Sequence, residues 1–552
     1  MLKRLISIVL IGCFSATIAQ DSIRKADIHA ALRLIDLKYT EAEVDSMFQS
    51  VRTNLSYIKL QHQSKLSNDV PLAFIHSPLL PNMQPLSPNK RAIQWKAPVS
   101  KLPINKEELA FYSVAELSYL IKNKIISSEE LTKFFISRIK NWGDTLQCVV
   151  SITVELAIQE AKAADADIKA GNYRGPLHGI PYGLKDLFAV KGTKTTWGAA
   201  PYKDQVIDQD AFVYQQLKKS GAVLVAKFTL GALAMGDVWF GGRTNNPWNM
   251  TYGSSGSSAG SASATVAGLV PFAIGTETWG SIISPSSTCG ATGLRPTFGT
   301  VSRSGGMTLC WSLDKVGPIT RNAMDAAIVY EAIIGKDAND RSTVAAGFDF
   351  NPQYDIKKMK IAYAKNYFDR IRDTTRSEWK VLAEFKKMGV ELIPVVFPDS
   401  GVYKPGMMDL VLTAECAATF DEFTRLNVDD MMTAQKRGDW PNIFRTARLL
   451  PATSYINANR QRYQLMEKVN QLTEQYDVII CPTRGSGNQS AITNLTGHPA
   501  ICVPTGFDSK TNLPSSITFI GKLYGEGAIV AAADAYQKKT QWHQQHPEKF
   551  KK

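Results

Sequence analysis

Short apolar runs alternate with amphipathic segments along most of this 552-residue chain. The apolar run at residues 222–226 directly follows a helical pattern that closes at Gly221, and similar runs occupy residues 361–364, 478–481 and 500–503. Short apolar runs bounded by glycine and by helices are typical of strands that are buried on both faces. We therefore expect an α/β domain with helices on both sides of a central sheet.

The helices of this domain have recognisable starts. Residues 113–116 and 127–130 form capping boxes, in which a serine hydroxyl accepts a first-turn amide and a glutamate reaches back. We expect each box to open a short helix, and a further helix to cover residues 154–170. Residues 400–460 are mostly helical in pattern and lie between strands, which makes them a candidate insertion on the substrate side.

The N-terminal region has a different pattern from the rest of the chain. Residues 22–60 carry helical periodicity, and a stretch with five prolines between Pro71 and Pro88 follows, which is not helical throughout. The expected apolar face of this helix consists of Ile28, Leu32, Ile35 and Tyr39. We expect residues 20–104 to form a helical arm and a Pro-rich connector that pack on a main domain over residues 105–545.

The first nineteen residues have the order of a secretory signal. Lys3 and Arg4 precede an apolar stretch at residues 5–14, and small residues follow. We expect cleavage before Gln20 and an exported protein, periplasmic or secreted. The sequence around Cys13 also resembles a lipoprotein cleavage box, so a lipid anchor at Cys13 is the alternative. No later run reaches about 18 apolar residues, so no transmembrane segment is expected.

Composition and charge exclude several classes of function. An apolar content of 44% supports a large core, and the net charge of +13 is scattered, which predicts solvated faces and no nucleic-acid surface. The seven histidines contain no His-Glu-x-x-His motif and the cysteines no Cys-x-x-Cys pair, so no metal or other cofactor is expected. Most of the six cysteines after Cys13 should be buried, although export would permit a disulfide.

A Ser/Gly-rich run at residues 253–262 leads into an apolar segment, which a flexible linker would not do. Within it, residues 256–260 fit Gly-x-Ser-x-Gly, the nucleophile elbow of α/β-hydrolases. That elbow needs a strand directly before it, and the preceding segment is polar and contains a proline. Buried serines beside glycines therefore indicate chemistry of another kind.

Lys185 lies in an apolar stretch bounded by glycines. A lysine is almost never fully buried unless it is paired. The amine of Lys185 is therefore expected either to reach the surface or to be held in the interior for a catalytic role. Burial lowers the pKa of a lysine, and a neutral amine can act as a base. The alternative is a structural lysine in an ion pair, with Asp186 as the candidate partner.

In order and spacing, a series of segments over about residues 105–540 resembles the amidase signature family. These segments are Gly179-Ile-Pro with Lys185-Asp186, Asn246-Pro-Trp-Asn249, Gly256-Ser-Ser with Gly260-Ser-Ala262, Gly275-Thr with Gly280-Ser-Ile and Pro285, Cys289-Gly with Gly293-Leu-Arg-Pro-Thr and Gly299, Val301-Ser-Arg303, Leu313-Asp with Val316-Gly-Pro318, and Asn494-Leu-Thr-Gly-His-Pro-Ala500. The resemblance implies a single large domain with a mixed, twisted sheet between helices.

The resemblance also implies a catalytic triad and an acyl-enzyme mechanism. Ser281 matches the nucleophile, Ser257 the bridging serine whose preceding peptide bond is cis, and Lys185 the base. The backbone N–H groups of residues 278–281 match an oxyanion hole, which consists of Thr278, Trp279, Gly280 and Ser281. No metal or cofactor takes part in this chemistry.

Three positions depart from the usual pattern of the family. Trp279 stands where a glycine is common, Ile283 where an arginine often follows, and Glu277 where aspartate is more frequent. An indole beside the oxyanion hole could reshape the substrate pocket, or it could point away into the core. Both interpretations of Trp279 stay open.

The leading hypothesis is an exported amidase that hydrolyses a carboxamide or secondary amide of a small molecule or peptide, as a monomer or homodimer. The first alternative is the glutamine-hydrolysing A subunit of a tRNA-dependent amidotransferase, which the signal sequence argues against. The second is a binding or scaffold protein without activity, which the complete set of Lys185, Ser257 and Ser281 argues against.

Overall fold

The computed structural model of the protein describes residues 23–63, 66–70, 72–87, 93, 95, 97–404, 406–485 and 487–552. Its contacts divide the chain into two compact units, Met1–Leu66 and Ser67–Lys552. The signal sequence, the cleavage site before Gln20 and the alternative at Cys13 lie outside the described residues. The expected domain limits at 19/20 and 104/105 stay predictions.

The smaller unit is a pair of helices, α1 (Lys25–Leu34) and α2 (Glu41–Gln61). The expected apolar face of Ile28, Leu32, Ile35 and Tyr39 is wrong for its last two residues. Asp36 has a φ of 54°, which breaks the helix, and Ile35 and Tyr39 are exposed. The two helices meet through the buried residues Ile28, Leu32 and Val44.

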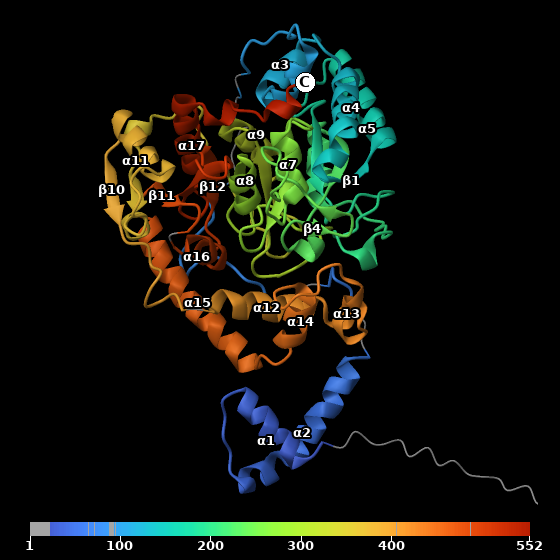
Figure 1. Ribbon diagram of the computed structural model, residues 1–552, viewed down its shortest axis with the longest axis vertical. Helices are drawn as coiled ribbons and strands as arrows, with labels where there is room; N and C mark the ends of the chain where they lie inside the picture. The colour runs from blue at the N-terminus through green and yellow to red at the C-terminus, as the bar shows by residue number, and fades with distance from the viewer. Residues whose placement is uncertain are drawn as a thin grey trace, which may run out of the picture. The chain divides into compact units, whose positions relative to one another are not determined.

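The larger unit is built around one mixed sheet (Figure 1). Its strands are β1 (Val149–Ile152), β2 (Pro181–Lys185), β3 (Val223–Phe228), β6 (Phe272–Glu277), β7 (Thr292–Arg295), β8 (Lys315–Thr320), β9 (Ile361–Ala364), β10 (Leu392–Val395), β11 (Val478–Pro482), β12 (Ala500–Phe507) and β13 (Pro514–Ile520). In the described chain their order is β1-β3-β2-β6-β8-β7-β12-β13-β11-β9-β10. β2 is parallel to β3 and β6, and β9 is parallel to β10 and β11, whereas the other pairs are antiparallel.

Two groups of helices flank this sheet. One group contains α4 (Ser128–Leu146), α5 (Val154–Lys169), α7 (Ala259–Val266) and α8 (Ile283–Cys289), and the other contains α6 (Phe212–Ser220), α9 (Ala323–Ile333), α11 (Ser377–Lys387) and α17 (Glu526–Thr540). Every residue of β2, β3, β7, β8 and β11 is buried, as strands between two helical layers should be. This arrangement confirms the α/β prediction.

The predicted helix starts are confirmed at both capping boxes. Helix α3 (Val114–Lys122) begins after Ser113 and α4 after Ser127, and in each box both reciprocal hydrogen bonds are present. Shorter helices complete the unit: α10 (Lys365–Phe368) and α16 (Gln489–Thr496). A two-stranded hairpin, β4 (Val238–Trp239) and β5 (Gly242–Arg243), stands apart from the main sheet.

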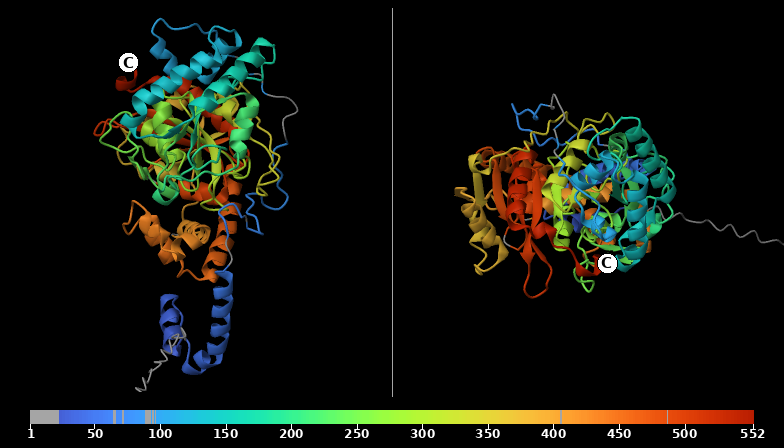
Figure 2. Two further views of the ribbon diagram at one scale, coloured as in Figure 1. Left: turned by 90° about the vertical axis from the view of Figure 1, so that its right-hand side faces the viewer. Right: turned by 90° about the horizontal axis from the view of Figure 1, so that it is seen from above.

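The segment expected to be a helical insertion lies between β10 and β11. It contains α12 (Met407–Thr419), α13 (Asp421–Arg425), α14 (Trp440–Ala447) and the start of α15 (Ala452–Thr473). These helices lie together at one end of the sheet, drawn in orange (Figures 1 and 2). The prediction of a mostly helical segment is therefore confirmed, and its place on the substrate side stays a prediction.

None of the helices that the structure describes is long and apolar enough to cross a membrane. Cys148, Cys289, Cys310, Cys416, Cys481 and Cys502 are all buried and unpaired. They serve as small core side chains, as the sequence predicts for most of them.

Candidate active site

Lys185 is the last residue of β2 and is completely buried. Its Nζ atom lies 2.8 Å from the Oγ of Ser257, 3.1 Å from the Oγ of Ser258 and 2.8 Å from the Oγ1 of Thr276. Burial lowers the pKa of Lys185 to about 7, and the charges of two nearby carboxylates offset part of that effect. The amine is held by hydroxyl groups and can lose its proton near neutral pH.

Asp186 does not pair with Lys185, so the ion-pair alternative is wrong. Its Oδ1 atom lies 3.0 Å from the Nζ of Lys227 on β3, and both side chains are completely buried. Its other carboxylate oxygen, Oδ2, accepts hydrogen bonds from the backbone N–H and the hydroxyl of Thr196. The carboxylate beside Lys185 in the sequence therefore neutralises a different lysine in space.

Ser257 lies in the loop that leads to α7, and its peptide bond with Gly256 is cis, as the resemblance implied. A Cβ atom on Gly256 would lie 1.7 Å from the carbonyl oxygen of Gly236, so only glycine fits at this close approach. The last described strand before this loop is the short β5, which ends at Arg243. This agrees with the expectation that no nucleophile elbow is built here.

The turn at residues 278–281 connects β6 to α8, and Glu277 anchors it. Its carboxylate accepts hydrogen bonds of 2.9 Å from the N–H groups of Ile282 and Ile283, and it pairs with buried Arg295 at 2.8 Å. Burial alone raises the pKa of Glu277, but the charge of Arg295 and these hydrogen bonds lower it to about 2. Glu277 therefore holds the turn as a permanent anion, although it departs from the usual aspartate.

Within the described chain, the backbone N–H groups of Thr278, Trp279, Gly280 and Ser281 donate to no protein acceptor. They are free donors on one turn, as the predicted oxyanion hole requires. Ser281 keeps 9% of its surface exposed, and its carbonyl oxygen accepts a hydrogen bond of 3.2 Å from the N–H of Ser258. That bond fixes the two serine-bearing segments side by side.

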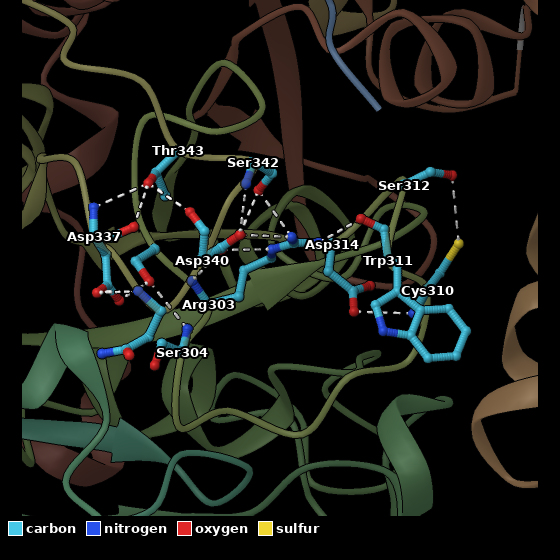
Figure 3. A network of polar contacts seen from close by, with 12 residues as sticks. Arg303, Ser304, Cys310, Trp311, Ser312, Asp314, Asp337, Asp340, Ser342 and Thr343 are labelled. Atoms are coloured by element: carbon cyan, nitrogen blue, oxygen red, sulfur yellow. Dashed lines mark hydrogen bonds and ion pairs between the residues drawn. The ribbon is translucent and has the colours of Figure 1, made fainter. Parts of the chain in front are cut away.

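The structure adds two residues that sequence reasoning did not assign. Thr276 holds Lys185, and Asp314 receives a 2.5 Å hydrogen bond from the hydroxyl of Thr278. Asp314 also accepts hydrogen bonds from the N–H groups of Leu309 and Cys310, so it ties the turn at residues 278–281 to the loop at residues 309–310. Asp314 and Cys310 are labelled in Figure 3. Thr276 and Asp314 both lie in segments that carry the family resemblance, which was the only signal available.

Trp279 does not point into the core. Its side chain is 43% exposed, and no described aromatic ring stacks on it. Of the two interpretations, the structure excludes the buried one. The indole lies at the surface of the turn that carries the free N–H groups.

The chain matches the family described as Amidase over residues 130–488, which is well over half its length. It is 33% identical over 480 residues to the glutamyl-tRNA(Gln) amidotransferase A subunit of Acinetobacter baumannii, covering 78% of this chain and 96% of that protein. The corresponding protein of Coxiella burnetii is 32% identical over 484 residues, covering 79% and 99%.

Two solved structures show the same fold. The peptide amidase from Stenotrophomonas maltophilia is similar with a TM-score of 0.69 and 26% identity, covering 79% of this chain and 98% of that one. An amidase family protein from Bacillus anthracis is similar with a TM-score of 0.71 and 24% identity, covering 80% and 94%. The mixed sheet and its helical layers are thus those of known amidase structures.

Proposed function

Because this chain belongs to the amidase signature family, we propose that it is an amide hydrolase in which Lys185, Ser257 and Ser281 form the catalytic triad. Membership of the family makes it an amide-hydrolysing enzyme. The proposal concerns the residues that do the chemistry and the class of amide, a carboxamide or secondary amide of a small molecule or peptide.

In the proposed mechanism, neutral Lys185 withdraws a proton from Ser257, which takes one from Ser281. The Ser281 oxygen attacks the amide carbonyl, and a tetrahedral oxyanion forms. The free N–H groups of residues 278–281 stabilise that oxygen, and losing one such donor typically costs about 100- to 1,000-fold in rate. Ser257 returns the proton to the leaving amine, and water then releases the acyl group from Ser281.

One observation carries this proposal: a completely buried lysine whose Nζ lies 2.8 Å from the hydroxyl of Ser257. Buried Lys227 on the neighbouring strand, by contrast, faces a carboxylate. The Ser281 hydroxyl makes no hydrogen bond to a described residue, so the transfer between Ser281 and Ser257 belongs to the proposal.

The test is Ser281→Ala, assayed against amino-acid amides, C-terminally amidated peptides and fatty amides. The variant should lose at least about 1,000-fold in kcat/KM while its thermal melt stays within a few degrees of the wild type. Ser263→Ala, directly after the serine-rich run, is the matched control, because the Ser263 hydroxyl donates to the backbone carbonyl of Asn245 and forms no hydrogen bond with a residue of the triad. Full activity in Ser281→Ala would show that Ser281 is not the nucleophile.

A second candidate function is that of the A subunit of a tRNA-dependent amidotransferase. The observation in its favour is the 33% identity over 96% of such a protein from Acinetobacter baumannii. Glutaminase activity of the purified chain that appears only with partner subunits and tRNA would establish it. Hydrolysis of simple amides by the chain alone, as monomer or homodimer, would favour the first candidate.

We also propose export, from the signal-like order of residues 1–19. Mass spectrometry of the N-terminus of the protein made in its native host tests this. A chain beginning at Gln20 supports release, and a lipidated Cys13 supports anchoring. An uncleaved Met1 would contradict both.

A further inference from the structure

A cavity of about 510 Å³ lies in the larger unit, and neither the triad nor the turn at residues 278–281 lines it. Its walls come from five parts of the chain: residues 72–79 of the connector, Arg303, the loop at residues 311–312, residues 340–342, and α15. About half of its lining residues are apolar or aromatic, and these include Phe74, Ile75, Leu79, Trp311, Ile456 and Met466. A volume of a few hundred cubic ångströms with an apolar lining is typical of a small-molecule site.

Two of the cavity's arginines are satisfied by the protein. Arg303 forms a two-pronged ion pair with Asp340, with both bonds at 3.0 Å (Figure 3). Arg462 is buried and donates to the hydroxyl and carbonyl of Ser312, whose hydroxyl in turn donates to the carboxylate of Glu415. The charge of Arg303 is therefore balanced directly by Asp340, and that of Arg462 is balanced by Glu415 through Ser312, without a direct ion pair.

The other two arginines of the cavity are not balanced. Arg341 and Arg460 are exposed, and neither forms an ion pair with a residue that the structure describes. Each has a single weak contact, Arg341 with the carbonyl of Ala73 at 3.4 Å and Arg460 with the Oδ1 of Asn457 at 3.2 Å. The cavity thus carries an excess of two positive charges beside an apolar interior.

One further polar group of the lining is suited to an anionic oxygen. The indole N–H of Trp311 is buried and has no acceptor among the described residues. The Nε2 of His76 accepts a hydrogen bond of 2.9 Å from Arg462, and burial lowers the pKa of His76 well below the usual value, so this side chain adds no charge. A buried donor without a partner costs free energy that a bound acceptor would recover.

We propose that this cavity binds an apolar molecule with one anionic head group, a carboxylate in the simplest case. The apolar body fills the space between the connector and α15, and the head group pairs with Arg341 and Arg460. A guanidinium group matches a carboxylate through two parallel hydrogen bonds. The proposal does not depend on the proposed function, because none of the cavity's residues belongs to the triad.

The test is calorimetric titration of the full chain with dodecanoate below its micelle concentration, with dodecyltrimethylammonium as the cationic counterpart. We expect one dodecanoate per chain and no binding of the cation. In Arg341→Gln/Arg460→Gln the dodecanoate affinity should fall roughly tenfold or more, since each 1.4 kcal/mol of lost interaction is tenfold. Arg372→Gln, an exposed arginine outside the cavity, is the matched control and should bind as the wild type does.

The proposal would be overturned by no binding of dodecanoate, by equal binding of the anion and the cation, or by unchanged affinity in the double variant. Titrations with dodecyl phosphate and with vesicles of anionic lipid then show whether the head group can be a phosphate and whether it can belong to a lipid bilayer. Binding to vesicles without binding to either monomeric amphiphile would also overturn it. Ser281→Ala should bind dodecanoate as the wild type does, so a failure of the cavity proposal can be distinguished from a failure of the proposed triad.

Discussion

Lys185 and Lys227 lie on adjacent parallel strands, and both are completely buried, but they have opposite kinds of partner. Lys227 faces the Asp186 carboxylate at 3.0 Å and also donates to the carbonyl of Lys194 and the hydroxyl of Thr195. Lys185 faces the hydroxyls of Ser257 and its neighbours. Burial lowers the pKa of both lysines, and for Lys227 the charge of Asp186 offsets part of the effect.

The comparison shows that burial alone does not identify a base. Both lysines lose hydration in the sheet, and the hydrogen-bond partner of each amine decides whether that amine can take part in proton transfer. A carboxylate stabilises the ammonium form and accepts its hydrogen bonds, so Lys227 stays a structural cation. A hydroxyl can pass a proton in either direction, so Lys185 has a route to a reacting group.

Replacement of Lys185 should give the largest effect on activity. Lys185→Ala is expected to lower kcat/KM by at least about 1,000-fold, because no proton acceptor remains. Activity should recover in part at high pH, where solvent can replace the base. Lys185→Arg should also be inactive, since a guanidinium does not deprotonate. An active arginine variant would contradict the role of a base.

Replacement of Lys227 should instead affect stability. Lys227→Met leaves the Asp186 carboxylate buried and unpaired, which should lower the free energy of unfolding by about 3 to 5 kcal/mol. Denaturant unfolding measures this loss. Lys227→Met/Asp186→Asn, which removes both charges, should recover most of it. If the single variant were inactive although folded, the division of roles between the two lysines would be wrong.

The pH dependence of stability sharpens the same comparison. The pKa of Lys185 is about 7 in the folded protein against a usual 10.5, so the unfolded chain binds more protons between these values. Wild-type stability should therefore rise with pH from 7 to 10.5, by up to about 1.4 kcal/mol per pH unit from this group.

Lys185→Met removes that contribution. The stability of the variant relative to the wild type should increase as the pH is lowered from 10 to 7, by a few kcal/mol in all, on the order of the full pKa shift. Urea unfolding at several pH values measures it. A difference that does not change over this range would mean that Lys185 stays protonated in the fold.

The smallest expected effect concerns the hydroxyls around Lys185. Thr276→Val removes one hydroxyl at 2.8 Å from Nζ and keeps the shape of the side chain, so kcat/KM should fall by roughly tenfold, the value of one hydrogen bond. The proposed proton route through Ser257 is untouched. A loss as large as that of Lys185→Ala would show that Thr276 has a direct part in proton transfer.

Sequence reasoning reached the fold through local signals, and it reached the chain positions of the candidate site through the family resemblance. The capping boxes at Ser113 and Ser127 specify helix starts through contacts within four residues, and both are present. The break at Asp36 was missed, since helical periodicity continues across it. The cavity beside α15 was also missed, because its lining residues come from distant parts of the chain.

What the sequence by itself determined is the α/β class, the family, and the candidate residues Lys185, Ser257 and Ser281. Which carboxylate pairs with which lysine was decided only by the tertiary structure. Successive residues along a strand point to opposite faces, so Asp186 turns away from Lys185. Lys227 pairs in register with Leu184, two residues before Asp186, and therefore shares a face with that carboxylate. Strand register is a property of the sheet, and the sequence pattern leaves it open.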